Sequence, residues 1–259
     1  MESALLSFSD TGTGLPLVLL HAFPLSRRMW EAQIAAWSHR FRVIAPDWRG
    51  FGESPPGDEE FTMESCADDL QQLLRYLKVK EMIVLLGLSM GGYIAFEFLR
   101  KYQDQLCGLI LAATQPIADS EPSRKARYET AELVQKEGTG PLAGKLIPRL
   151  LGKTTLETKP DVVERVRSLI QSNSRQGIAK ACYGLACRRD SSSLLDEIQI
   201  PTLVLAGSED AIVPRAQTET LHQNVPSSRL TLVDESGHLI NLEQPGKFQD
   251  AVLSFLMGL

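Results

Sequence analysis

The stretch MIVLLGLSMGGYIAFEFLRKY, residues 82–102, changes its pattern halfway along. Its first part is a continuous apolar run of strand length, which is typical of a strand buried on both faces of a sheet. Its second part carries apolar residues at helical spacing. Between the two parts, Gly87-Leu88-Ser89-Met90-Gly91 fits G-x-S-x-G, a pattern that exposes a serine hydroxyl on a sharp strand-to-helix turn. The stretch predicts such a turn, with Ser89 as a candidate nucleophile.

The rest of the chain alternates between strand and helix patterns around this unit. Strand patterns lie at 15–22, the start of 41–54, 106–114, 201–210 and 228–238. Helical patterns lie at 28–40, 62–79, 214–223 and 244–257, and Thr62 is a plausible N-cap residue. This alternation predicts an α/β fold, with a mostly parallel central sheet flanked by helices.

The alternation stops between residues 116 and 195. This part of the sequence has no convincing strand pattern, and its apolar residues recur at three and four positions. The helical patterns lie at 121–137, 140–151, 159–172 and 175–188. We therefore expect a core domain made of residues 1–115 and 196–259, with a helical cap subdomain, residues 116–195, inserted late in the chain.

Composition narrows the classes of protein and partner. Apolar residues make up 43% of the 259 residues, and the net charge is −5 with no Lys/Arg run, so we expect no nucleic-acid or membrane partner. No apolar run reaches the roughly 18–20 residues of a membrane span, and no secretory-signal pattern is visible. The four cysteines show no zinc-type spacing, which favours free thiols in a reducing cytosol. We expect a cytoplasmic monomer or homo-oligomer without metal or cofactor.

A serine hydroxyl needs a base to take its proton and an acid to orient that base. His238 follows the strand pattern at 228–238, and Asp210 ends the one at 201–210. Catalytic groups gather at the carboxyl ends of strands in open α/β sheets. We therefore assign His238 as base and Asp210 as orienting acid, in preference to the neighbouring Glu209 and to Asp234.

The segment LLHAFP, residues 19–24, follows the first strong strand pattern. In acyl-transfer sites this loop supplies one backbone N–H for the oxyanion, and the residue after the nucleophile supplies the other. We assign these donors to Phe23 and Met90. His21 is expected to be a structural loop residue, and Asp47 and Arg49 are expected to brace the loop at 47–54 and each other.

Five segments in order, HAFP, DWRGFGES, GLSMGG, GSEDAIVP and SGHLINLEQP, together resemble the α/β-hydrolase superfamily. Within it, LLHAFPLSRRMWEAQ and the SMGG turn resemble the 3-oxoadipate enol-lactonase-like esterases and lactonases, whose helical cap falls where residues 116–195 lie. Dehalogenases and epoxide hydrolases of this fold carry Asp at the nucleophile, where this chain has Ser89. One departure is Ala22, where the family usually has Gly; we expect little effect unless this position needs a positive φ.

These observations predict a serine hydrolase that cleaves carboxylic esters or lactones of small-to-medium acyl size through an acyl-enzyme. Trp30, Leu142 and Leu146 are candidate pocket residues. Three alternatives stay open. A C–C bond hydrolase of a ring-cleavage product would use the same three residues, and an N-acyl homoserine lactonase is a narrower form of the same activity. A ligand receptor on a hydrolase scaffold would bind without turnover.

Overall fold

The structure is a computed structural model that describes residues 6–259. A single sheet of seven strands forms the centre of this part of the chain. The strands are β1 (Phe8–Thr11), β2 (Pro16–Leu20), β3 (Arg42–Pro46), β4 (Ile83–Leu88), β5 (Leu106–Ala112), β6 (Thr202–Gly207) and β7 (Ser228–Val233). Their order in the sheet is β1-β3-β2-β4-β5-β6-β7, and all neighbours are parallel except β1 and β3. This confirms the predicted α/β fold.

Strand β1 is the one strand that the sequence patterns do not predict. It is four residues long, FSDT, and its side chains are half-buried or exposed. The interior strands β2 and β4 are instead buried along their whole length. An edge strand without a buried face leaves no apolar run to recognise.

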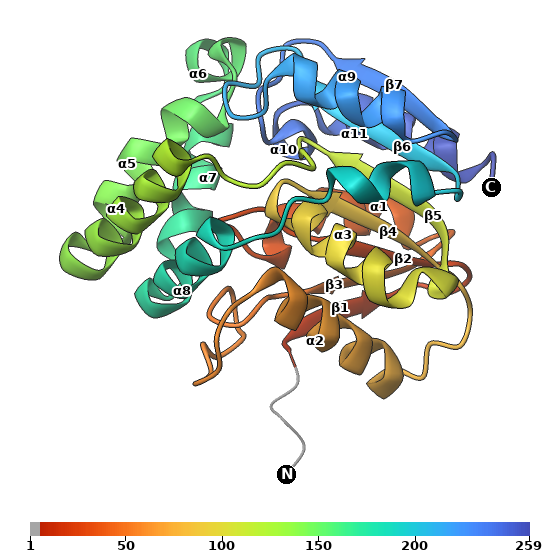
Figure 1. Ribbon diagram of the computed structural model, residues 1–259. Helices are drawn as coiled ribbons and strands as arrows, with labels where there is room; N and C mark the ends of the chain where they lie inside the picture. Colours follow the sequence, from red (N-terminus) through yellow and green to blue (C-terminus); the bar gives the residue numbers. More distant parts are fainter. Residues whose placement is uncertain (1–5) are drawn as a thin grey trace.

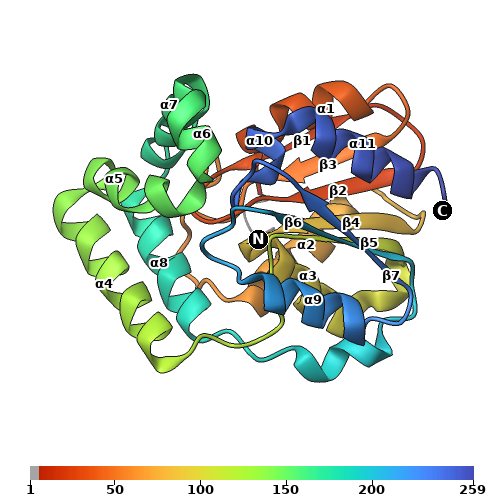
Figure 2. The same cartoon turned by 90° about the horizontal axis from the view of Figure 1, so that it is seen from above.

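Helices cover both faces of the sheet. Figure 2 shows α1 (Glu31–Trp37), α10 (Ile240–Glu243) and α11 (Pro245–Leu256) on one face, and α2 (Met63–Tyr76), α3 (Met90–Tyr102) and α9 (Arg215–Asn224) on the other. Short 3-10 helices lie at Arg27–Trp30 and Gln103–Gln105. The predicted N-cap of α2 is confirmed, because the Thr62 hydroxyl accepts from the Ser65 amide at 2.9 Å.

Five helices lie between β5 and β6: α4 (Glu121–Glu137), α5 (Thr139–Leu150), α6 (Lys153–Thr158), α7 (Pro160–Gln171) and α8 (Arg175–Ala186). We call residues 116–195 the helical insertion. A 3-10 helix at Ser192–Glu197 leads out of it. Within it α4 packs on α8, and α5 packs on α7. The insertion lies beyond one end of the sheet (Figure 1).

Helix α6 is absent from the sequence prediction. Its sequence, KTTLET, is polar and has only six residues, so it carries no measurable apolar period.

The sheet topology brings distant loops together beside the helical insertion. Strands β2, β4, β6 and β7 run parallel, so their carboxyl ends meet at one edge of the sheet. The loops that follow them carry Phe23, Ser89, Asp210 and His238. Within residues 6–259, no helix combines the length and the apolar content needed to cross a membrane.

Candidate active site

Ser89 occupies a strained backbone position between β4 and α3, with φ 56° and ψ −112°. A non-glycine residue in a sparsely populated region costs about 1–3 kcal/mol and is kept only where the surroundings enforce it. Here the Ser89 amide donates to the carbonyl of Ala112 at 2.9 Å, and the Thr114 hydroxyl donates to the Ser89 carbonyl at 3.0 Å. These bonds hold the turn that exposes the serine side chain.

The glycines of the G-x-S-x-G turn are required by close packing. A Cβ on Gly91 would lie 2.2 Å from the carbonyl oxygen of Leu20 on β2. A Cβ on Gly87 would lie 2.4 Å from the carbonyl oxygen of Gly91. The start of α3 can therefore sit against β2 only if Gly91 lacks a side chain, and against the end of β4 only if Gly87 lacks one.

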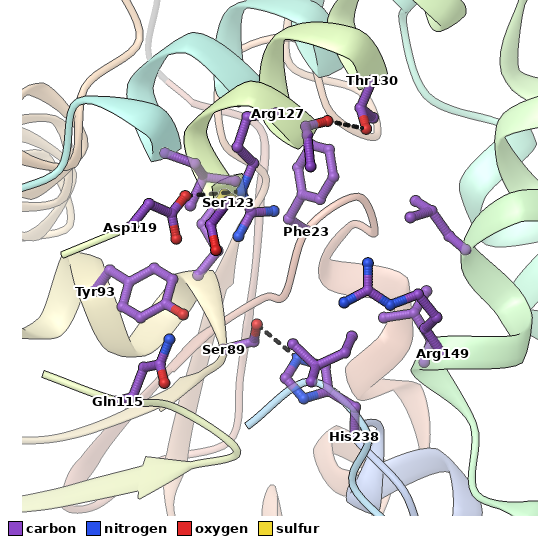
Figure 3. Close-up of a pocket in the computed structure, with 16 residues that line it drawn as sticks. Phe23, Ser89, Tyr93, Gln115, Asp119, Ser123, Arg127, Thr130, Arg149 and His238 are labelled. Atoms are coloured by element: carbon purple, nitrogen blue, oxygen red, sulfur yellow. Dashed lines mark hydrogen bonds and ion pairs between the residues drawn. The ribbon is translucent and has the colours of Figure 1, made fainter. Parts of the chain in front are cut away.

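Ser89, His238 and Asp210 form a continuous chain of hydrogen bonds. His238 Nε2 lies 2.7 Å from Ser89 Oγ, and His238 Nδ1 lies 2.9 Å from Asp210 Oδ2 (Figure 3 shows the Ser89–His238 contact). The carboxylate can only accept at Nδ1, so the neutral imidazole carries its proton there and offers Nε2 to the serine hydroxyl. His238 is 1% exposed. The structure thus brings together the three residues that the sequence analysis singled out.

Asp210 is held in its ionised form by its surroundings. Its Oδ1 accepts from the amides of Ile212 at 2.7 Å and Val213 at 3.0 Å. Burial alone raises the pKa of this carboxyl, but the facing His238 imidazole and the two amides outweigh burial, so the pKa lies below its usual value. An ionised Asp210 can stabilise a positive charge on the imidazole.

A cavity of about 160 Å³ opens over Ser89. The rest of the described chain, residues 6–115 and 196–259, is called the body, and it lines the cavity with residues that include Phe23, Met90, Tyr93 and Gln115. The helical insertion supplies the opposite walls, from the loop before α4 and from α4, α5 and α8. The cavity therefore lies between the sheet edge and the insertion.

Two of the three predicted pocket residues lie elsewhere. Leu146 on α5 lines the cavity, but Trp30 and Leu142 are not among its lining residues. Trp30 is fully buried against Phe248, with ring centroids 6.1 Å apart, and Leu142 is fully buried in the insertion. Apolar periodicity marks the buried side of a helix, but it does not tell which buried residues face a cavity.

The cavity also contains charged groups that the sequence analysis missed. Asp119 is paired with two cations: its Oδ2 lies 3.1 Å from Arg127 Nε, and its Oδ1 lies 2.6 Å from Arg188. The Arg188 guanidinium also stacks on the Tyr93 ring, 4.1 Å from its centroid.

Arg149 on α5 is exposed, and its side chain has no hydrogen-bond or ion-pair partner in the described part of the chain. Figure 3 shows its guanidinium directed into the cavity. The helical spacing of Arg149 from Leu146 was the available signal for this residue. Positive charge exceeds negative charge in the cavity wall.

The two predicted oxyanion donors both border the cavity. Phe23 and Met90 line it, and neither backbone amide has an acceptor among residues 6–259. Met90 is the first residue of α3, where backbone amides have no partner inside the helix. Ala22, the departure from the family pattern, is not among the residues with positive φ, so its methyl group causes no backbone strain.

The neighbouring loop residues have structural partners. His21 is fully buried; its Nε2 accepts from the Trp48 amide at 3.1 Å, and its Nδ1 faces the Ala22 carbonyl. Burial lowers the pKa of His21 to about 4, which keeps the imidazole neutral. This agrees with the structural role expected for it.

The prediction that Asp47 and Arg49 brace each other is wrong. Asp47 pairs with Arg27, and Arg49 pairs with Asp69 and Glu59. Asp47 thus ties the loop to Arg27, and Arg49 ties it to Asp69 on α2.

Comparisons with known proteins give the family. Residues 16–245 match the family described as alpha/beta hydrolase fold. A thermophilic esterase from Thermogutta terrifontis, solved with malate bound, is 45% identical and superposes with a TM-score of 0.95 over 98% of this chain and 93% of its own. The enol-lactonase from Burkholderia xenovorans is 26% identical, with a TM-score of 0.90 over 97% and 96% of the two chains.

A curated relative is also similar to this chain over most of its length. The 3-oxoadipate enol-lactonase 2 of Acinetobacter baylyi is 28% identical over 236 residues, covering 91% of this chain and 86% of its own length. The predicted resemblance is therefore confirmed. Since the family match spans most of the chain and the sheet has the expected topology, the chain belongs to the α/β-hydrolase fold family.

Proposed function

We propose that the protein hydrolyses carboxylic esters or lactones through an acyl-enzyme formed on Ser89. The observation that carries this proposal is the Ser89–His238–Asp210 hydrogen-bond chain, which ends at a cavity. The esterase and enol-lactonase names of its relatives support it.

In the first half of the reaction, His238 Nε2 takes the proton of Ser89 Oγ, and the oxygen attacks the carbonyl carbon. The carbonyl oxygen becomes negative and is stabilised by the amides of Phe23 and Met90. Asp210 stays ionised and stabilises the imidazolium. His238 then returns the proton to the leaving alkoxide, which leaves an acyl group on Ser89.

In the second half, a water molecule takes the place of the alkoxide. His238 accepts a proton from this water, and the resulting hydroxide attacks the acyl carbonyl. The same two amides hold the second oxyanion. Collapse of this intermediate returns the proton from His238 to Ser89 and releases the acid.

Residues 116–195 act in this proposal as a cap subdomain on a core of residues 1–115 and 196–259. The helices of the insertion supply about half of the cavity wall, so they set the size and polarity of the acyl group. A volume of about 160 Å³ favours small-to-medium acyl groups.

The charges of the cavity favour an acyl group that carries a carboxylate. Arg149 has no carboxylate of the protein to pair with among the described residues, whereas Asp119 is already shared by two arginines. A guanidinium binds a carboxylate through two parallel hydrogen bonds. The malate in the Thermogutta terrifontis esterase structure and the 3-oxoadipate in the name of the enol-lactonase point to the same chemistry in those proteins.

The test is Ser89→Ala, assayed with p-nitrophenyl acetate. We expect the rate per mole of protein to fall at least about 1000-fold, since loss of a nucleophile from a triad removes most of the catalysis. The thermal midpoint should fall little, because among residues 6–259 only the His238 side chain hydrogen-bonds to the hydroxyl. A folded Ser89→Ala protein with the wild-type rate would contradict the proposal.

One substrate panel separates the alternatives left open by the sequence. It comprises p-nitrophenyl esters, γ- and δ-lactones, N-acyl homoserine lactones and a dienoate diketone, each run with Ser89→Ala as control. Preferential turnover of the diketone would indicate a C–C bond hydrolase, and preferential turnover of homoserine lactones would indicate that narrower lactonase. Stoichiometric binding without turnover would indicate a receptor.

A further inference from the structure

The end of α5 is hydrogen-bonded directly to the loop that carries His238. We call residues 150–154, from the last residue of α5 to the second residue of α6, the α5–α6 junction. The carbonyl of Leu150 accepts from the amides of His238 at 3.1 Å and Leu239 at 3.3 Å. Leu150 also lines the cavity, as do Leu146 and Arg149 of the same helix. The backbone of the proposed base is therefore bonded to the helix that faces the substrate.

Glu243 joins the same two segments through its side chain. Its Oε2 accepts from the Gly152 amide at 2.8 Å, and its Oε1 accepts from the amides of Gly237 at 3.0 Å and Leu239 at 3.1 Å. Glu243 is fully buried, and no Lys, Arg or His of the described chain forms an ion pair with its carboxylate. Burial raises the pKa of this carboxyl, and three backbone N–H groups rather than a paired cation hold its oxygens in place.

Glu209 makes the matching connection from the loop of Asp210. Its Oε2 accepts from the Thr154 amide at 2.8 Å, and its Oε1 accepts from the Thr154 hydroxyl at 2.5 Å. The Glu209 amide also donates to the carbonyl of Ser236, at 2.8 Å, so the loops of Asp210 and His238 are bonded to each other as well. Both loops thus meet at the α5–α6 junction.

The backbones at this meeting point are in close contact. A Cβ on Gly237 would lie 2.3 Å from the Gly152 nitrogen, and a Cβ on Gly152 would lie 2.5 Å from Glu209 Oε2. Since neither glycine has room for even a methyl group, the junction can shift little against the two loops.

We infer that Glu243 and Glu209 are positioning residues. They fix the positions of His238 and Asp210 relative to Ser89 by holding the loops of these two residues against the α5–α6 junction. This inference rests on the proposed function. Neither glutamate reaches the substrate cavity, so both act through the proposed triad. Because a small misplacement of reacting groups is costly, their loss should appear in kcat rather than in KM.

The first variant is Glu243→Gln. It keeps the shape of the side chain, but its amide offers one acceptor oxygen and one donor nitrogen to three backbone N–H groups. At least one N–H then meets another donor, and the His238 loop must shift. We expect kcat for p-nitrophenyl acetate to fall about 10- to 100-fold, with KM little changed.

The second set of variants tests Glu209 through its partner Thr154 in the helical insertion. Thr154→Val removes the hydroxyl that donates to Glu209, and Thr154→Ser keeps it. The matched control is Thr158→Val on the same helix, because in the described part of the chain the Thr158 hydroxyl donates to the Thr154 carbonyl alone and does not contact Glu209. We expect kcat to fall severalfold in Thr154→Val and to stay near the wild-type value in Thr154→Ser and Thr158→Val.

Two further readouts separate positioning from stability. The rate is expressed per active site, counted by stoichiometric labelling of Ser89 with a fluorophosphonate. The low-field proton resonance of the imidazole N–H shared by His238 and Asp210 is recorded by NMR. We expect this resonance to move or broaden in Glu243→Gln and Thr154→Val, and to persist unchanged in Thr154→Ser and Thr158→Val.

The inference is overturned if Glu243→Gln and Thr154→Val keep the wild-type kcat per labelled site. It is also overturned if their activity falls only in proportion to the fraction of unfolded protein. If Glu243→Gln does not fold, the Thr154 series still decides the question for Glu209. Absence of Ser89-dependent turnover in the wild-type protein would instead overturn the proposed function, so the two failures are distinguishable.

Discussion

At the scale of single residues, two charged groups of the cavity wall differ in their partners: Asp119 is paired within the described part of the chain, and Arg149 is not. Asp119 is neutralised by Arg127 and Arg188, and one of these, Arg188, is almost fully buried. Arg149 has no such partner in residues 6–259 and faces the cavity from α5. In the proposed function, a substrate carboxylate would pair with Arg149, and Arg149 would then discriminate among esters that Ser89 would otherwise treat alike.

Arg149→Gln tests that role with two esters that differ only at the end of the acyl chain. Mono-4-nitrophenyl adipate ends in a carboxylate, and 4-nitrophenyl hexanoate ends in a methyl group. We expect the wild-type protein to prefer the adipate, and kcat/KM for the adipate to fall about 10-fold or more in Arg149→Gln, since a charged hydrogen bond contributes about 1.5–3 kcal/mol. The value for the hexanoate should change little.

Arg124→Gln is the matched control, because Arg124 is an exposed arginine of the insertion that does not line the cavity. It should leave both esters unaffected. Equal use of the two esters by the wild-type protein would count against the carboxylate preference, while leaving ester hydrolysis by Ser89 intact.

At the scale of elements, the fit of α3 against β2 decides whether Ser89 is presented at all. Gly91 lies where a methyl group would overlap the Leu20 carbonyl, and that carbonyl belongs to the sheet. Backbone of this kind cannot swing aside as a flexible side chain can. Gly144 on α5 provides the contrast, because a Cβ there meets nothing within 4 Å.

We expect Gly91→Ala to lower the free energy of unfolding by about 2 kcal/mol or more, since overpacking typically costs about 1–3 kcal/mol. Activity per folded molecule should fall as well, because α3, which begins with Met90, must shift away from β2. Gly144→Ala should raise the free energy of unfolding by about 0.5–1 kcal/mol, since alanine is the better residue inside a helix. Urea unfolding of the two variants beside wild type measures both changes. A Gly91→Ala protein as stable as Gly144→Ala would contradict this account of the turn.

Elements with a strong local pattern could be predicted from sequence, and weakly patterned ones could not. The unit of β4, Ser89 and α3 follows from an apolar run, a glycine turn and a helical period within residues 82–102. Helix α6 and strand β1 are short and polar, so their place depends on contacts made elsewhere in the fold. The Thr154–Glu209 bond at the start of α6 is one such contact.

At the scale of the whole molecule, the grouping of Ser89, Asp210 and His238 was predictable because a parallel sheet aligns the carboxyl ends of its strands. His238 and Ser89 are 149 positions apart in the sequence, yet each follows a strand of the same sheet. The cavity wall was not predictable in the same way. Whether Leu142, Leu146 or Arg149 faces Ser89 depends on how α5 is rotated and placed against the body, and no repeat in the sequence encodes that placement.

Several bonds besides those of the α5–α6 junction tie the helical insertion to the body. Asn173, almost fully buried after α7, donates to the carbonyls of Pro24 at 2.7 Å and Leu169 at 2.8 Å, and it accepts from the Gly52 amide at 2.7 Å. Lys180 on α8 donates to the carbonyl of Gly57 at 2.6 Å. The insertion therefore shares polar contacts with the body over several separate segments, some of them buried, which favours cooperative unfolding of the two.

Thermal unfolding tests this coupling, because the three tryptophans, Trp30, Trp37 and Trp48, all lie in the body. Tryptophan fluorescence then follows the body, while far-ultraviolet circular dichroism also follows the helices of the insertion. We expect the two midpoints to coincide in the wild-type protein. Asn173→Ala should lower both together, on the order of 5 °C, because it leaves buried backbone groups unpaired. A loss of helical signal well before the tryptophan transition would show that the insertion unfolds on its own, and the body would then be the independent folding unit.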